Sequence, residues 1–257
     1  MTRDHLQAVL RRISGAQVEL IALGLVTTWT DRANLAAEYR RGRVLLAGDA
    51  AHIHSPLGGQ GLSLGLGDAM NLGWKLAATV RGDAPAGLLD SYQRERLPLA
   101  EHILDWSRAQ VALMRPDRGA QALRAIVRDL IATRDGATYF AERVWGMSTH
   151  YDLGSHHPLV GRSAPNFELV DGTRLNEHLR HGRALMLDFG GSDVLQTLAD
   201  LSGDQIAYVR CDARDRLDLH ALFVRPDGFV AWASDRPSDD GGDRPQIEYH
   251  GVAVARR

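Results

Sequence analysis

The chain has 257 residues, of which 44% are hydrophobic, and its formal net charge is −2. This length is enough to bury one large core or two ordinary ones. Acidic and basic residues are interleaved, which argues against a nucleic-acid-binding surface and against a patch for anionic membranes. The one cysteine, Cys211, cannot form an internal disulfide, and no apolar stretch is long enough to span a membrane, so we expect a cytoplasmic protein.

The first fifty residues predict a short helix and two strands. Apolar residues recur at helical spacing between Leu6 and Ile13, and residues 17–29 are rich in Val, Ile, Leu and Thr, as strands are. The short apolar run from Val44 to Ala47 stops at Gly48. Such a run is typical of a parallel strand that is buried on both faces.

The middle of the chain is predicted to be almost entirely helical. One helix starts near Leu62 and ends near Arg81 and Gly82, because glycine is a common C-terminal cap. A longer helix runs from about residue 88 to 114, and Pro98 inside it implies a kink or a break. Further helical patterns cover residues 120–133 and 137–145.

A change of composition near residue 155 predicts a domain boundary, with domains at residues 1–154 and 155–257. Beyond it we expect an extended segment at 167–170, helices at 175–180 and 194–201, strands at 184–189 and 206–210, and a hairpin of 221–224 with 229–233. This order of elements suits a small α/β sandwich. The tail from residue 234 to 245 is rich in Asp, Gly, Pro and Arg, and it is predicted to be a flexible loop.

The most informative segment of the chain runs Gly48-Asp-Ala-Ala-His-Ile-His-Ser-Pro-Leu-Gly-Gly-Gln-Gly61. It indicates a strand end, a glycine-rich turn and a helix start, an order typical of a site for a polar cofactor. The carboxylate of Asp49 can accept hydrogen bonds from sugar or ribityl hydroxyls. The later glycines let the main chain approach a flat ring, and the helix start presents free N–H groups and a positive dipole end.

This run resembles the second fingerprint of the single-component FAD-dependent aromatic-ring hydroxylases, Gly-Asp-Ala-Ala-His followed by Pro-x-Gly-Gly-Gln-Gly. The resemblance extends to Asp68-Ala69, Asn71-Leu-Gly-Trp-Lys-Leu76 and residues 88–96. Residues 157–165, 171–175 and 224–232 resemble the thioredoxin-like C-terminal domain of the polyketide-hydroxylating members. The expected fold class is therefore α/β, with part of a glutathione-reductase-like FAD-binding domain, long helices and a thioredoxin-like α/β domain.

The resemblance also implies a function and a set of site residues. NAD(P)H would reduce FAD, and one atom of O₂ would be transferred to a small aromatic or polyketide substrate. The implied flavin-binding residues are Gly48, Asp49, Pro56, Gly58, Gly59, Gln60, Gly61, Leu62 and Ser63. Pro56 and Leu57 would lie near the substrate side of the flavin, and no residue is assigned to the chemical step itself. Family members commonly have Asn at position 63 and Pro at position 55, so we expect backbone contacts to carry more of the binding.

Other chemistries find little support in the residues. His52 and His54 have no carboxylate or thiol set at metal spacing, so no metal site is predicted. Ser55 lacks the pattern of a nucleophile elbow, which argues against a hydrolase. The thioredoxin-like segment has Gly190-Gly-Ser-Asp193 where a redox pair would stand, so dithiol chemistry is excluded.

The dinucleotide-binding pattern Gly-x-Gly-x-x-Gly does not precede the fingerprint. We therefore expect the chain alone to bind FAD poorly. The favoured hypothesis is a fragment or truncated form of a flavin hydroxylase. A second is one subunit of a split hydroxylase, whose partner chain supplies the N-terminal half. A third is a non-catalytic scaffold protein with a vestigial flavin site, and exposed apolar edges would also favour a homo-oligomer.

Overall fold

The computed structural model describes residues 2–28, 30 and 32–237. They form two compact units, one within residues 1–32 and the other within residues 33–257. The boundary predicted near residue 155 stays a prediction, since residues on both sides of it lie within the second unit. The tail predicted to be flexible lies outside the described residues from position 238 onwards.

The first unit contains helix α1 (Arg3–Ser14), as its apolar spacing predicts. The helix begins after Thr2, whose side chain accepts a hydrogen bond from the main chain of His5, and it ends at Gly15 with a φ of 65°. The strand predicted at residues 17–29 is wrong, because the described residues 17–28 form none. Ile21 and Leu25 are 87% and 89% exposed, so an apolar, β-branched composition alone did not produce a paired strand.

The second unit begins with four strands of two residues each and a 3₁₀ turn. Strands β1 (Asn34–Leu35) and β4 (His52–Ile53) pair antiparallel, as do β2 (Arg40–Arg41) and β3 (Val44–Leu45), and η1 (Gly48–Ala50) follows β3. The predicted buried parallel strand at 44–47 is therefore wrong. The chain turns at Gly42, so β3 pairs with its own hairpin neighbour, and Val44 is 63% exposed.

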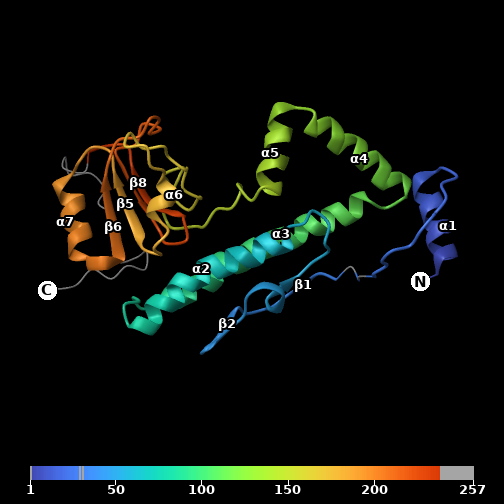
Figure 1. The fold of residues 1–257 in the computed structure, drawn as a ribbon, viewed down its shortest axis with the longest axis horizontal. Helices are drawn as coiled ribbons and strands as arrows, with labels where there is room; N and C mark the ends of the chain where they lie inside the picture. Colours follow the sequence, from blue (N-terminus) through green and yellow to red (C-terminus); the bar gives the residue numbers. More distant parts are fainter. Residues whose placement is uncertain (1, 29, 31, 238–257) are drawn as a thin grey trace. The chain divides into compact units, whose positions relative to one another are not determined.

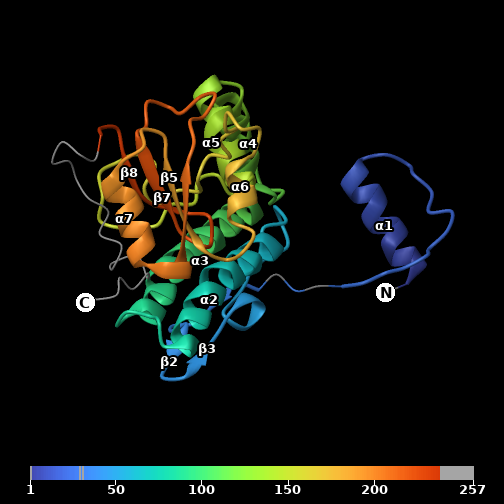
Figure 2. The same ribbon diagram turned by 60° about the vertical axis from the view of Figure 1, so that its left-hand side comes forward.

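Four helices follow, and their order agrees with the prediction. They are α2 (Gly61–Arg81), α3 (Leu88–Leu113), α4 (Arg118–Ile131) and α5 (Arg134–Val144). Helices α2 and α3 pack side by side, as Figures 1 and 2 show. Helix α2 ends at Gly82 with a φ of 84°, as expected. The predicted break at Pro98 is wrong, since α3 is one continuous helix. Pro98 has no N–H group to donate to the main-chain carbonyl of Arg94, and both residues are exposed.

The rest of the second unit holds a four-stranded sheet in the order β6-β5-β7-β8. Its strands are β5 (Ala184–Asp188), β6 (Ile206–Arg210), β7 (Ala221–Val224) and β8 (Val230–Ser234), and only β5 and β6 are parallel. Helices α6 (Leu175–His178) and α7 (Asp193–Leu201) and the 3₁₀ turn η2 (Gly203–Gln205) complete it. The predicted order of elements is confirmed, although α6 is shorter than expected and residues 167–170 form only isolated bridges.

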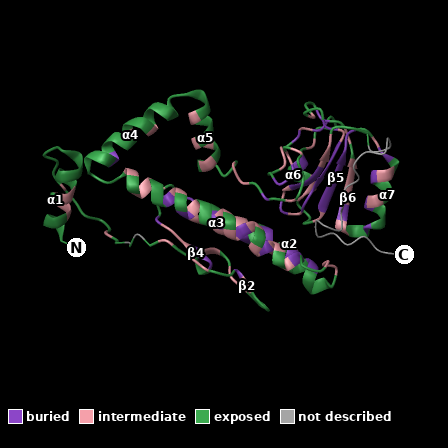
Figure 3. Ribbon diagram, turned by 180° about the vertical axis from the view of Figure 1, so that it is seen from behind, coloured by how far each residue is buried: buried purple, intermediate pink, exposed green. Residues whose placement is uncertain are grey.

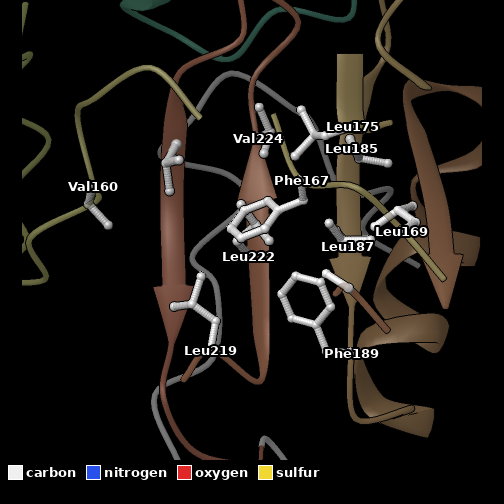
Figure 4. Packing of buried hydrophobic residues seen from close by; sticks show 12 residues of the cluster. Val160, Phe167, Leu169, Leu175, Leu185, Leu187, Phe189, Leu219, Leu222 and Val224 are labelled. Carbon is white, nitrogen blue, oxygen red and sulfur yellow. The ribbon is translucent and has the colours of Figure 1, made fainter. Parts of the chain in front are cut away.

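Both faces of this sheet are covered, which explains why its central strands β5 and β7 are buried along their length (Figure 3). On one face Leu187 and Leu222 pack against Phe167 and Phe189, as Figure 4 shows. On the other face Met186 and Phe223 pack against the apolar side of α7. Successive residues of β5 thus point into two different cores, the usual consequence of strand pleating.

Candidate functional site

The glycine-rich loop between β4 and α2 is folded as a tight turn around a cleft. Gly58 and Gly59 in this loop, and Gly48 at the start of η1, have φ values of 82°, 64° and 58°, a backbone region that favours glycine. The cleft has a volume of about 320 Å³, and it is lined by Asp49, His52, Ile53, His54, Pro56, Gly59, Gly61 and Leu62. The structure therefore brings together Asp49, Pro56, Gly59, Gly61 and Leu62 of the predicted site residues.

The remaining predicted residues support the loop or face elsewhere. Gln60 is buried, and its Nε2 donates to the main-chain carbonyl of Arg143 at 2.8 Å, so this side chain anchors the loop to the end of α5. Gly58 packs against α3, because a Cβ at this position would lie 2.9 Å from the Gln110 side chain. Ser63 lines a different cavity, Leu57 is half-buried, and Gly48 begins η1.

Asp49 is the exposed carboxylate of the cleft. It takes part in none of the ion pairs found among the described residues. Its position in η1, between β3 and the glycine-rich loop, leaves the carboxylate oxygens available as hydrogen-bond acceptors. This is the arrangement that the sequence predicts for a contact to ribityl or sugar hydroxyls.

A second carboxylate, Asp68 on α2, lies beneath the loop and is fully buried. Its Oδ2 accepts a hydrogen bond from the main-chain N–H of Gly48 at 2.9 Å and lies 2.7 Å from Nε2 of His52. Its Oδ1 accepts from Nε of Arg96 at 2.7 Å. Burial alone would raise the pKa of Asp68, but hydrogen bonds from His52, Arg96 and Gly48 outweigh it, and the pKa lies below its ordinary value.

Arg96 extends this network from the loop to the second half of the unit. Besides Asp68, its guanidinium donates to the main-chain carbonyl of Leu64 at 2.7 Å and to the hydroxyl of Tyr151 at 2.9 Å. The Tyr151 ring lies 4.3 Å from the ring of Phe229, measured between centroids. The turn that presents Asp49 is thus fixed through Asp68 and Arg96 to the aromatic pair beside the sheet.

A separate buried ion network joins the helices to the β7–β8 turn. Both carboxylate oxygens of Glu95 accept from Arg225, at 3.0 and 2.8 Å, and Nζ of Lys75 lies 2.9 Å from Glu95 Oε2. Arg225 also pairs with Asp227, which accepts from Nε1 of Trp74 at 3.1 Å. Burial opposes the charge on Glu95, but Arg225 dominates and lowers the pKa of this carboxyl to about 2.

Neither network was predicted from the sequence. Asp68 and Lys75 belong to the segment that resembles the hydroxylase family, but their residue types alone do not reveal partners on another helix. One feature of the sequence could have indicated buried charges: charged residues occupy the same faces of α2 and α3 as buried apolar residues. Leu64, Asp68, Asn71 and Lys75 follow each other at helical spacing and are all buried.

Where a thioredoxin-like domain would carry a pair of redox cysteines, this chain has a turn whose N–H groups are bound by a carboxylate. Asp188 at the end of β5 accepts hydrogen bonds from the N–H groups of Gly190, Gly191 and Ser192, at 3.0, 2.7 and 2.6 Å. Cys211 lies at the end of β6 and is half-buried.

Within the described part of the chain, no cluster of three or more His, Cys, Asp or Glu could hold a metal, and no helix is long and apolar enough to cross a membrane.

The residues around the cleft fit the ring and ribityl part of FAD. Nε2 of His54, a residue that lines the cleft, is buried and has no hydrogen-bond partner among the described residues. Above Gly59 no atom would meet an added Cβ within 4 Å, so the space over the loop is open. An unsatisfied polar atom, an open glycine surface and the start of a long helix are the features that a polar, flat ring needs.

Comparisons with known proteins support this assignment. The family model described as FAD binding domain matches residues 1–107, and the one described as aromatic-ring hydroxylase, C-terminal, matches residues 157–247. A protein of Claviceps purpurea named as a monooxygenase is 51% identical over 91% of this chain and 47% of its own length. The rifampicin monooxygenase of Rhodococcus hoagii is 42% identical over 93% of this chain and 48% of its own length.

The solved structures give the same result. The anhydrotetracycline hydroxylase of Streptomyces rimosus superposes with a TM-score of 0.85 at 37% identity, and the match covers 95% of this chain and 51% of that one. The chain thus spans about half the length of the relatives it matches. The fingerprint, the loop cleft and both family matches agree, and the chain belongs to the family of FAD-dependent aromatic-ring hydroxylases.

Proposed function

We propose that this chain supplies the flavin-ring and ribityl part of the FAD site in an aromatic-ring hydroxylase that uses NAD(P)H and O₂. The observation that carries the proposal is the cleft at the start of α2, with Asp49 at its rim and the Gly48 turn held by buried Asp68. When bound, FAD supplies the redox and oxygen-transfer chemistry of the family. The residues of this chain bind and orient it.

Two groups in the cleft have separate roles in this proposal. The carboxylate of Asp49 accepts hydrogen bonds from ribityl hydroxyls, because it is exposed and placed in η1 at the rim of the cleft. The N–H groups at the start of α2 face the polar edge of the ring, where the helix dipole favours negative charge. Pro56, which is exposed in the loop, and Leu57 beside it face the substrate.

The substrate class we propose is a small aromatic or polyketide compound. Relatives of the chain include proteins named as rifampicin monooxygenase and anhydrotetracycline monooxygenase. Each name describes a monooxygenase of a named compound, and the matches cover 93% and 91% of this chain.

We also propose that the chain by itself binds FAD weakly and that a polypeptide with a dinucleotide-binding Gly-x-Gly-x-x-Gly segment completes the site. Several large apolar side chains of α2 face outward, among them Leu62, Leu66 and Val80, which are 77%, 58% and 80% exposed. A face of this kind is suited to packing against another sheet or chain. Self-association through the same face is the competing possibility.

The test is an FAD titration of the purified chain, alone and together with the N-terminal part of a relative such as the Rhodococcus hoagii enzyme. We expect flavin fluorescence to change strongly only when both polypeptides are present. Tight FAD binding by the chain alone would contradict the proposal that its flavin site is incomplete. Absence of binding in both cases would favour the scaffold hypothesis, and sedimentation of the chain alone would reveal self-association.

A further inference from the structure

A second cavity, separate from the flavin-side cleft, lies within the second unit. It has a volume of about 330 Å³, and its walls come from α2, α3, the end of α5 and the β7–β8 turn. None of the residues that line the flavin-side cleft lines this cavity. Its volume falls at the lower end of the range for sites that bind small molecules.

The walls of this cavity are rich in aromatic side chains. Trp106, Trp145, Tyr151 and Phe229 come from four different segments of the chain and all line it. Tyr151 is almost fully buried, whereas Trp145 is 78% exposed at its edge. Flat aromatic walls favour a flat aromatic ligand, because ring stacking adds to the gain from burying apolar surface.

Two buried N–H donors at the same cavity have no hydrogen-bond partner among the described residues. They are Nε1 of Trp106 and Nε of Arg143. An unpaired buried donor costs free energy. Both atoms are closed to a water-sized sphere, so a ligand that brings acceptor oxygens to this end of the cavity would pair with them once the Trp106 and Arg143 side chains turn towards it.

Arg143 also provides a charge that no carboxylate of the described residues neutralises. Its guanidinium lies over the ring of Tyr139, 3.4 Å from the centroid, and its Nη1 donates to the main-chain carbonyl of Tyr139. It forms no ion pair with any described residue. By contrast, the other charged groups that line the cavity, Arg96 and Asp227, are paired with Asp68 and Arg225.

We propose that this cavity binds a small planar aromatic carboxylate. The ring lies among Trp106, Trp145 and Phe229, and the carboxylate accepts hydrogen bonds from Arg143 and from Nε1 of Trp106. The site is distinct from the flavin-side cleft, and its occupancy requires no FAD. An occupant would nevertheless contact the rear of the flavin loop, because Gln60 lines the cavity and donates to the main chain of Arg143.

The probe for the test is 2-naphthoate, with its neutral amide as the matched ligand, each titrated into the purified chain without flavin by calorimetry. We expect the carboxylate to bind roughly tenfold more tightly than the amide, which is the size of one charge-assisted hydrogen bond. Equal affinity of the two ligands, or no heat from either at millimolar concentration, would overturn the proposal.

Two variants and a control locate the binding. Arg143→Gln should weaken 2-naphthoate binding roughly tenfold and leave amide binding nearly unchanged. Retained amide binding also shows that the variant is folded. Trp106→Phe keeps an aromatic ring but removes the donor, and it should weaken carboxylate binding several-fold. Arg108→Gln removes an exposed arginine of α3 that does not line the cavity, and an equal loss there would show that general charge attraction, not this site, explains binding.

Discussion

Apolar residues of the sheet of β5 to β8 and several apolar residues between positions 15 and 47 have opposite environments, although Tyr39 within that range is fully buried. Leu187 and Leu222 in the sheet are fully buried. Ile21 and Val44 are 87% and 63% exposed. The difference follows from the available partners, since each sheet strand has hydrogen-bonded neighbours and a covered face, whereas no long strand pairs with residues 15–47 in the described part of the chain. Apolar composition produces a core only where a packing partner is present.

From this comparison we expect the largest loss of stability when a leucine of the sheet is truncated. Leu222→Ala should lower the free energy of unfolding by about 2–5 kcal/mol, because it removes buried apolar surface and leaves a cavity. The measurement is urea denaturation followed by circular dichroism. The matched control is Ile21→Ala, for which we expect a change within about 0.5 kcal/mol. A large effect at Ile21 would mean that this side chain is buried in solution, against the exposed fraction found here.

A smaller loss is expected at the carboxylate beneath the flavin loop. Asp68→Asn leaves the buried guanidinium of Arg96 without its charged partner, and it should lower the free energy of unfolding by about 3 kcal/mol. The same variant should loosen the Gly48 turn, which hydrogen exchange of the loop amides would detect. Unchanged exchange at the loop would show that Asp68 stabilises the helices without positioning Asp49.

The ion network at the β7–β8 turn predicts a dependence on pH. The pKa of Glu95 is lowered from 4.5 to about 2 in the folded chain, so its contribution is present above pH 4.5 and is lost as the pH falls towards 2. Glu95→Gln should cost about 1–2 kcal/mol at neutral pH, since Arg225 keeps Asp227 as a partner. The stability of the Glu95→Gln variant should also fall less steeply than that of the unaltered chain between pH 4.5 and 2. Parallel stability curves for the two proteins would argue that Glu95 is not buried as described.

The sequence predicts those parts of the molecule whose partners are close in the chain or whose motif is specific. The ends of α2 follow from a glycine loop before it and Gly82 after it, and the alternating elements of residues 175–234 are confirmed almost in full. The buried charges are different. Asp68, Arg96, Glu95 and Arg225 lie up to 130 residues from their partners, and the local pattern shows only that some of them share a helix face with buried apolar residues, without indicating the partner.

Asp49 offers the sharpest contrast, because it should matter for binding and hardly at all for stability. It is exposed and forms no ion pair among the described residues, so Asp49→Ala should change the free energy of unfolding by no more than about 0.5 kcal/mol. FAD binding, measured with the N-terminal part of a relative present, should nevertheless fall at least tenfold, since the ribityl hydroxyls lose a charged acceptor.

The controls for Asp49→Ala are Cys211→Ser and Asp105→Ala, which lie outside the cleft and should leave the affinity for FAD unchanged. Asp105 is an exposed carboxylate like Asp49, but it pairs with Arg108 on α3. Equal losses at the two aspartates would point to net charge and not to the cleft. A loss confined to Cys211→Ser would place the flavin site elsewhere. A loss confined to Asp49 would separate the two carboxylates near the loop by role, because Asp68 would then shape the turn and Asp49 would contact the cofactor.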